Sequence, residues 1–249
     1  MKVIMKKKLT VIVPIYKKQL NRNETISVEL CAKKMKQYDL FFIMPEHLDA
    51  TWYRQFQAFE VKRFPDKYFK GTDTYNKLML NPKFYKKFSE YEYMLIAQTD
   101  TLILGLPEEF GQFLDGDIDY IGAPWEKEQK FYFYTTKRFL YQSLHWGHEV
   151  LARVGNGGFS LRKIDKTIEL LKEKRFWRLL WRGNEDFFFA CYGEHNRCGF
   201  RLASIQMAKK FALETNMKLE LKLRKRKPFA VHKWEAEFNF YEEIQEYIR

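Results

Sequence analysis

The chain has few cysteines and no long apolar segment, and each of these two features argues against a class of protein. Its three cysteines, Cys31, Cys191 and Cys198, cannot supply the paired disulfide framework of a small secreted domain, so we expect a reducing, cytoplasmic setting. The first apolar run holds only about eight residues between a basic N-terminus and Lys17, too few for a signal peptide or for a span of ~20 residues. We therefore expect a soluble protein that is at most peripheral to a membrane.

Linkers and several common catalytic motifs are also missing. No Pro-, Ser- or Gly-rich linker, repeat or low-complexity tract divides the 249 residues, so residues 1–249 are expected to form one domain. The sequence has no Gly-x-Ser-x-Gly motif, no P-loop and no complete Gly-x-Gly-x-x-Gly motif after a strand. Hydrophobic residues make up 46% of the chain and aromatic residues 18%, which is ample for a packed core and excludes a disordered protein.

Positive charge is abundant. The net charge is +12, and its densest cluster lies at residues 218–227. Such an excess suits an anionic partner, which could be nucleic acid, an acidic membrane face or a phosphorylated small molecule. The structural alternative for this cluster is a solvated charged strand or loop.

The apolar pattern predicts an α/β fold. Strands are expected at residues 9–16, 39–44, 61–64, 93–97 and 119–124. Helices are expected at 24–38, at 72–87 in two pieces broken near Pro82, and at 164–174, 185–192, 205–214 and 235–248. Alternation of strands and helices implies a mostly parallel central sheet with helices on both faces, whose ligands bind beyond the carboxyl ends of the strands.

Asp100 and His232 are the first candidates for chemistry. Asp100 follows a predicted apolar strand, where a buried carboxylate needs a cation or hydrogen-bond donors, and Mg²⁺ or Mn²⁺ would compensate it. A turn-capping role is the structural alternative for Asp100, and a hydrogen-bonded histidine on a half-buried strand is the alternative for His232. His145 and His148 could instead pair on a metal, although no cysteine or carboxylate stands at zinc-site spacing from them.

Two further segments suggest a pocket with a general base. Residues 155–158 hold three glycines in four positions, which predicts a loop whose backbone approaches a ligand closely. Glu185 and Asp186 open a predicted helix, and one of these carboxylates could deprotonate an acceptor hydroxyl. The structural alternative is a helix start, with Asn184 as N-cap and both acids stabilising the first turn.

Taken in order, seven segments resemble a GT-A-type nucleotide-sugar glycosyltransferase, and more closely a bacterial glycosyltransferase-like family catalogued as a domain of unknown function. The segments are VIVPIY (11–16), TYNKLM (74–79), QTD (98–100), DYIGAPW (119–125), GNGGFSLR (155–162), NED (184–186) and PFAVHKW (228–234). They run through almost the whole chain. The resemblance implies a single-domain GT-A-like fold in which residues 1–104 bind the nucleotide donor and residues 105–249 bind the acceptor.

The resemblance also assigns roles. Asp100 matches the last Asp of an Asp-x-Asp metal motif and His232 the late histidine that completes the coordination of Mn²⁺ or Mg²⁺, while Asp186, with Glu185 beside it, matches the base of inverting enzymes. The implied donor site consists of Val13, Pro14, Tyr16, Tyr75, Asn76, Gln98, Thr99, Asp100, Gly157, Gly158 and Lys227. The implied acceptor site consists of Trp125, Asn156 and Phe159. Lys225, Arg226 and Lys227 are candidates to neutralise the departing pyrophosphate.

The implied activity is transfer of a sugar from a nucleoside-diphosphate sugar, with a UDP-sugar as the first expectation. The acceptor would be a hydroxyl of a glycan or lipid-linked glycan in bacterial surface polysaccharide or glycoconjugate synthesis. One departure is that Gln98 stands where the metal motif has its first Asp, which favours weaker metal binding or a catalytically inactive GT-A scaffold.

The alternative function from another class is a nucleic-acid-binding module built on residues 218–227. A nucleotidyltransferase is a weaker alternative, because the N-terminal phosphate loop expected of such an enzyme is absent. With a glycosyltransferase no nucleic acid partner is expected, and contact with the anionic inner face of a membrane is a hypothesis from charge. The oligomeric state is open.

Overall fold

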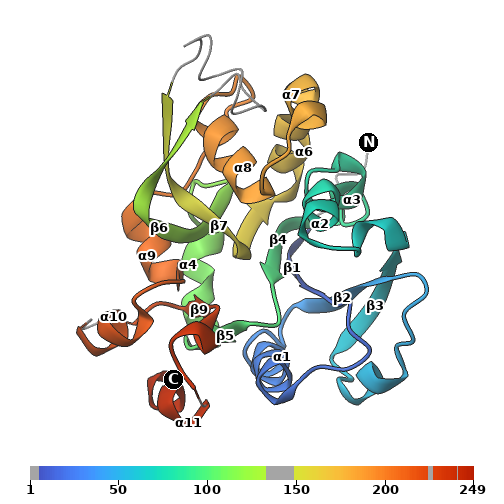
Figure 1. The fold of residues 1–249 in the computed structure, drawn as a ribbon, viewed down its shortest axis with the longest axis vertical. Helices are drawn as coiled ribbons and strands as arrows, with labels where there is room; N and C mark the ends of the chain where they lie inside the picture. The colour runs from blue at the N-terminus through green and yellow to red at the C-terminus, as the bar shows by residue number, and fades with distance from the viewer. Residues whose placement is uncertain (1–5, 133–148, 224–226, 240) are drawn as a thin grey trace.

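One six-stranded sheet runs through the molecule (Figure 1). The computed structural model describes residues 6–132, 149–223, 227–239 and 241–249, with strands in the order β3-β2-β1-β4-β7-β6. The strands are β1 (Lys7–Pro14), β2 (Asp39–Pro45), β3 (Phe59–Phe64), β4 (Tyr91–Ala97), β6 (Tyr120–Tyr132) and β7 (Glu149–Lys163). The first four are parallel, whereas β7 is antiparallel to β4 and β6 is antiparallel to β7. Because β4 and β7 come from the two halves implied by the sequence, a single sheet joins these halves.

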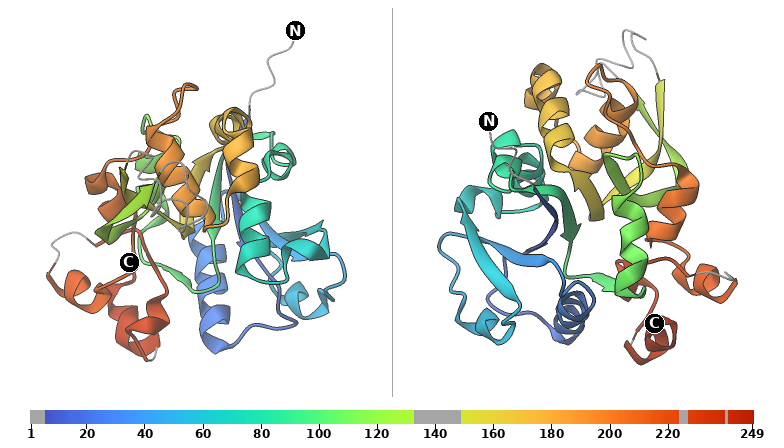
Figure 2. Two further views of the ribbon diagram at one scale, coloured as in Figure 1. Left: turned by 45° about the horizontal axis from the view of Figure 1, so that its top comes forward. Right: turned by 180° about the vertical axis from the view of Figure 1, so that it is seen from behind.

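Helices cover both faces of this sheet (Figure 2). In β1, Val11 and Val13 enter one apolar cluster while Ile12 enters the other, as the two-residue period of a strand requires. The first cluster packs against α1 (Arg22–Lys34), α4 (Gly111–Leu114) and α9 (Ile205–Phe211). The second packs against α2 (Thr72–Met79), α3 (Pro82–Lys86), α6 (Ile164–Glu173) and α8 (Glu185–Glu194). The predicted α/β fold with helices on both faces is confirmed.

A small second sheet completes the structure. It has the order β5-β9-β8 and is made of β5 (Thr101–Ile103), β9 (Ala230–His232) and β8 (Ala212–Leu213). A third apolar cluster beneath it includes residues of α10 (Met217–Leu223) and α11 (Tyr241–Ile244). The remaining elements are α7 (Arg175–Leu180) and the 3₁₀ turns η1 (Thr51–Gln55), η2 (Asp66–Tyr68), η3 (Pro107–Phe110), η4 (Trp234–Ala236) and η5 (Gln245–Tyr247). No helix among the described residues is long and apolar enough to cross a membrane.

The sequence predicted a loop at the glycine-rich segment 155–158. In the structure this segment is part of strand β7. Its pairing with β6 shifts register on both sides of Ala123, and Gly155 has φ of +152°. The two strands also come so close that a Cβ on Gly122 would lie 2.2 Å from the carbonyl oxygen of Asn156. The glycines therefore allow an irregular, closely approached strand to be built here.

Three further predictions at the C-terminal end were wrong. The helix expected at 205–214 ends at Phe211 because the next two residues pair with β9 as β8. The basic segment 218–227, expected as a strand or loop, begins as helix α10, since Met217 and Leu221 bury one face. The helix expected at 235–248 is replaced by η4, α11 and η5, from which Trp234 and Ile244 enter the third apolar cluster.

Candidate active site

Backbone pairing brings Asp100 and His232 together. Asp100 lies in the turn between β4 and β5, and the antiparallel pairing of β5 with β9 sets Thr101 opposite His232. The backbone N–H of Lys233 also donates to the carbonyl of Asp100 at 2.9 Å. As a result, Nε2 of His232 lies 3.2 Å from Oδ1 of Asp100 and 3.3 Å from Oε1 of Gln98.

Glu214 approaches the other side of the same imidazole. Leu213 of β8 is in register with Val231 of β9, so Glu214 follows beside His232, with 3.5 Å between Oε1 and Nδ1. Burial, the largest influence, lowers the pKa of His232, but the carboxylates of Asp100 and Glu214 together outweigh it and raise the pKa to about 9. We call Gln98, Asp100, Glu214 and His232 the strand-end cluster.

The donor atoms of the strand-end cluster fit a divalent cation. Oδ1 of Asp100 is buried and lies 3.2 Å from Nε2 of His232, so this carboxylate needs positive charge beside it. The Asp100 carboxylate and the Gln98 amide oxygen are ligand types that Mn²⁺ and Mg²⁺ prefer, and the neutral imidazole of His232 could add a nitrogen ligand. Among the described residues no three His, Cys, Asp or Glu side chains gather as a metal group, so the third ligand here would be the Gln98 amide.

Three consecutive residues of β7 connect this cluster to the carboxylates of α8. The amide of Asn156 donates to Glu214, and its Oδ1 accepts from the backbone N–H of Gly158 at 3.0 Å. The backbone N–H of Gly157 donates to Oδ2 of Asp186 at 3.3 Å. A Cβ on Gly158 would lie 2.0 Å from Nε2 of His232, and one on Gly157 would lie 2.4 Å from Oε1 of Glu185. The two glycines therefore let the histidine and the carboxylates approach one strand from its two sides.

The adjacent carboxylates of α8 have different surroundings. Glu185 accepts a 2.7 Å bond from Nη2 of Arg162, whose side chain is fully buried and also donates to Tyr85. Among the described residues Asp186 has no arginine partner of this kind, and it accepts from the backbone N–H groups of Gly157 and Phe187. Burial first, and then the charge of Glu185, raise the pKa of Asp186 to about 7. Asp186 is therefore able to exchange a proton near neutral pH, while Glu185 serves as the counter-ion of Arg162.

Several of the predicted donor-site residues surround this centre. Tyr75 has a buried hydroxyl without a partner, and burial followed by the charge of Glu185 raises its pKa. Asn76 donates to Oδ1 of Asn184, the N-cap residue of α8, at 3.1 Å. The hydroxyl of Thr99 donates to Glu24 at 3.0 Å. The contact of Asn76 places α2 next to the start of α8, and the contact of Thr99 places the turn after β4 next to the first turn of α1.

Other predicted residues lie elsewhere or face the core. The Phe159 side chain is fully buried and stacks on Phe211 with 4.8 Å between ring centroids, so the acceptor-binding role expected for it is wrong. Val13 and Pro14 are also buried, which leaves Tyr16, 60% exposed, as the side chain at the end of β1 that a nucleotide base could meet. Trp125 packs on Phe187 of α8 at 4.8 Å between ring centroids.

Of the basic residues predicted to face the pyrophosphate, the structure describes Lys227, which contacts the C-terminal segment. Nζ of Lys227 lies over the ring of Tyr247, 4.7 Å from its centroid, in the C-terminal segment. Lys225, Arg226, His145 and His148 lie outside the described residues. Lys218, at the start of the basic segment, pairs with Glu243 at 3.0 Å.

Two residues of the site carried no sequence prediction of their own. Glu214 follows an apolar stretch that looks helical, and only the pairing of β8 with β9 brings it to His232. Arg162 closes the glycine-rich motif, and its charge on a buried strand was a signal that a buried carboxylate must oppose it.

Comparisons with known proteins agree with this architecture. A family described as "Protein of unknown function (DUF5672)" matches residues 58–232. An active-site mutant of LgtC is similar in structure, with a TM-score of 0.54 at 12% identity over 96% of this chain and 94% of that one. No curated protein matches the chain.

Two further solved structures are similar over nearly their whole length. Apo mouse xyloside xylosyltransferase 1 has a TM-score of 0.50 at 14% identity, covering 90% of this chain and 97% of that one. A glycosyltransferase involved in the glycosylation of the major capsid of PBCV-1 has a TM-score of 0.50 at 10% identity, covering 91% and 93%. At these identities the likeness establishes the fold, which is of the GT-A glycosyltransferase type, as predicted.

Proposed function

The chain belongs to the DUF5672 family, and we propose that it is a glycosyltransferase that moves a sugar from a nucleoside-diphosphate sugar to a hydroxyl of a glycan acceptor. The GT-A-type fold supports this reaction class. The observation that carries the proposal is the tract 156–158 of β7, which connects the strand-end cluster to Asp186 through adjacent residues. The strand-end cluster, which would stabilise the charge of a leaving diphosphate, is therefore linked to Asp186, which would deprotonate the acceptor.

In the proposed reaction Asp186 takes the proton of the acceptor hydroxyl. The acceptor oxygen then forms a bond to the anomeric carbon of the donor sugar, and the bond from that carbon to the diphosphate oxygen breaks. The electron pair leaves with the nucleoside diphosphate, and a single displacement of this kind inverts the anomeric centre. A carboxylate with a pKa of about 7 is suited to this role, because an effective general base has a pKa near the working pH.

Asp100, Gln98 and His232 would hold a divalent cation, either Mn²⁺ or Mg²⁺. When bound, such a cation neutralises charge that develops on the diphosphate oxygens. Of the protein's own groups, Glu214 keeps the imidazole of His232 in place through its Nδ1 side. Asn156 in turn fixes Glu214 and the backbone of Gly158.

The finer assignments rest on the sequence resemblance. Residues 1–104 would hold the donor, for which a UDP-sugar is the first candidate, and residues 105–249 the acceptor. We place the protein in the bacterial cytoplasm, at the inner face of the membrane where lipid-linked glycans are built. The alternative function, nucleic-acid binding, rests on the basic segment 218–227. Two residues of this segment, Lys218 and Lys227, contact side chains of the C-terminal segment instead.

The proposal is tested with purified protein, a panel of nucleoside-diphosphate sugars and either Mn²⁺ or EDTA. We expect one nucleotide class to raise the melting temperature in the presence of Mn²⁺, and the matching donor to be consumed. Asp186→Asn should keep the Mn²⁺-dependent donor shift and lose turnover. The matched control is Asp165→Asn, which changes the first-turn Asp of α6, a side chain 59% exposed and paired with Lys6. Turnover by the Asp186 variant at the rate of this control would remove the assigned base.

A further inference from the structure

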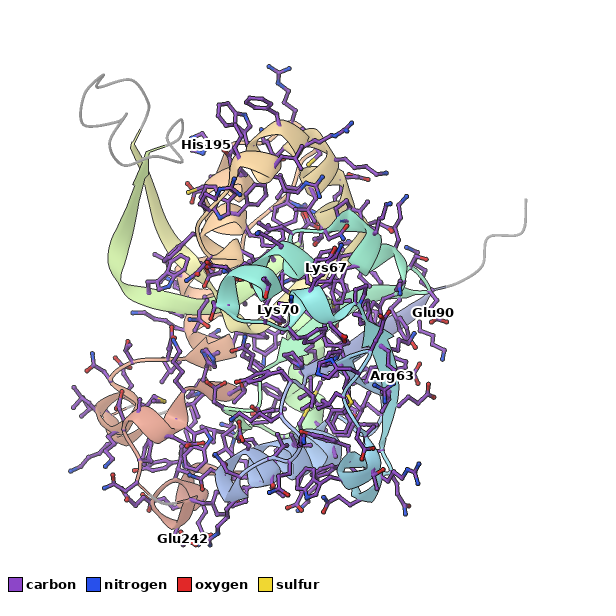
Figure 3. All side chains as sticks on the ribbon, turned by 45° about the vertical axis from the view of Figure 1, so that its right-hand side comes forward. Arg63, Lys67, Lys70, Glu90, His195 and Glu242 are labelled. Atoms are coloured by element: carbon purple, nitrogen blue, oxygen red, sulfur yellow. The ribbon has the colours of Figure 1, made fainter. Side chains whose placement is uncertain are left out.

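A groove of about 690 Å³ lies between α2 and α7. One wall comes from η2 and α2, and the other comes from α7 and the loop that leads to α8. Figure 3 shows two residues of the first wall, Lys67 and Lys70, beside α2. We call this the α2–α7 groove.

The groove carries a strong excess of positive charge. Five cationic side chains line it, and Asp73 is the one carboxylate among its lining residues. The five are Lys67, Lys70, Lys77, Arg178 and Arg182. Among the described parts of the chain, none of the five forms an ion pair with a carboxylate. Arg178 donates through Nη1 to the carbonyl of Leu80 at 2.9 Å, while its Nε is buried without a partner. Unpaired cations facing one groove favour a ligand with a phosphate group.

The groove adjoins the start of α8, the helix that carries Asp186. Asn76 lines it and donates to Asn184, which is the N-cap of α8 and stands two residues before Asp186. Arg182 and Gly183 of the same loop also line it. A ligand in the groove would therefore lie close to the first turn of α8, which carries Asp186.

The rim of the groove at α7 is apolar and exposed. The exposed fractions are 64% for Phe176, 62% for Leu179 and 40% for Leu180, and Leu179 also lines the groove. Arg175 and Arg178 stand within the same short helix, so α7 presents apolar and cationic side chains together. This combination is typical of a segment that rests in the headgroup region of an anionic bilayer.

We propose that the α2–α7 groove is the acceptor subsite, so that α2 serves the acceptor although it lies within residues 1–104, and that the groove binds a phosphate group carried on a hydrocarbon chain, at the surface of an anionic bilayer. The inference rests on the proposed glycosyltransferase function, because that function makes the groove an acceptor site. The cations bind the phosphate, and the apolar rim of α7 rests among the lipid chains. The hydroxyl of the acceptor is thereby presented to Asp186.

Binding is measured without donor, by co-sedimentation with phosphatidylcholine vesicles that contain or lack phosphatidic acid. The double variant Lys70→Gln/Arg182→Gln should bind the phosphatidic acid vesicles about 30-fold more weakly, since each cation near an anionic surface contributes about one factor of five. The control Lys36→Gln/Lys222→Gln removes the same charge from exposed positions on α10 and just after α1, and should bind like the unaltered protein. Equal losses in the two double variants would overturn the groove as the site.

A second pair of measurements separates lipid from free phosphate. Phe176→Ser/Leu179→Ser should lose vesicle binding and keep whatever thermal shift inorganic phosphate gives the unaltered protein. Unchanged vesicle binding by this variant would overturn the lipid source of the phosphate. The Mn²⁺-dependent shift with nucleoside diphosphates is recorded for every variant, so that failure of the donor site is seen independently of failure of the groove.

Discussion

Replacing Asp186 by Asn should stabilise the protein at alkaline pH while it abolishes turnover. Burial raises the pKa of Asp186 from 3.8 to about 7, so the folded chain holds this proton more tightly than the unfolded chain does. Stability is therefore lost as pH rises between these two values, and the loss is complete above about pH 7. A shift of this size corresponds to a cost of up to ~4 kcal/mol.

The Asn variant removes that cost but weakens the contacts with Gly157 and Phe187, so a net gain of ~1–3 kcal/mol is expected at about pH 8. Between about pH 5 and pH 8 the advantage of the variant should grow by ~2–3 kcal/mol, because the unaltered side chain is still protonated in the folded state at the lower pH. The assay is urea unfolding of both proteins at the two pH values, with Asp165→Asn as the matched control at an exposed position.

A helix-capping carboxylate would behave in the opposite way. If Asp186 only stabilised the first turn of α8, its pKa would be lowered and Asn would destabilise the protein at about pH 8. A destabilised variant, or a difference in unfolding free energy that does not change with pH, would refute the assignment of Asp186 as a buried carboxylate with a raised pKa.

Three other changes test the rest of the site. Glu185→Gln should cost ~3–5 kcal/mol of unfolding free energy, measured in urea, because Arg162 would be left buried without its counter-ion; a loss below about 1 kcal/mol would contradict that pairing. Gly158→Ala should abolish Mn²⁺-dependent donor binding in the thermal-shift assay, since its Cβ would displace His232, whereas Gly111→Ala, with no atom within 4 Å, should bind normally. Phe159→Ala should lower the unfolding free energy by ~3–5 kcal/mol, because it leaves a cavity against Phe211. An unfolding free energy equal to that of the unaltered protein would contradict the burial of Phe159.

The strand pattern and the positions of single strand-end residues could be predicted from the sequence. The apolar, β-branched run of β1 and the apolar run of β4 mark strands regardless of their partners, and Asp100 stands out because it lies in the turn after such a run. The same local signals predicted α6 and the helix start at Glu185. Features of this kind depend on neighbouring residues, which a sequence displays directly.

Pairings between distant segments could not be predicted in this way. Glu214 meets His232 only because two residues leave a helix to form β8, and Phe159 is buried because β7, which looked like a glycine loop, continues into the central sheet. The cations of the α2–α7 groove come from two segments about a hundred positions apart. They therefore form no cluster in the sequence, unlike the basic residues at 218–227. In each case tertiary packing overrode a correct local signal.

The most direct test of the central claim is to measure donor binding and transfer together, with Mn²⁺ and with EDTA, for the unaltered protein, Asp100→Asn and Asp186→Asn. We predict that Asp100→Asn loses the Mn²⁺-dependent donor shift, and that Asp186→Asn keeps this shift but transfers no sugar. Transfer by the unaltered protein at one rate in Mn²⁺ and in EDTA, together with full activity of both variants, would contradict the site described here.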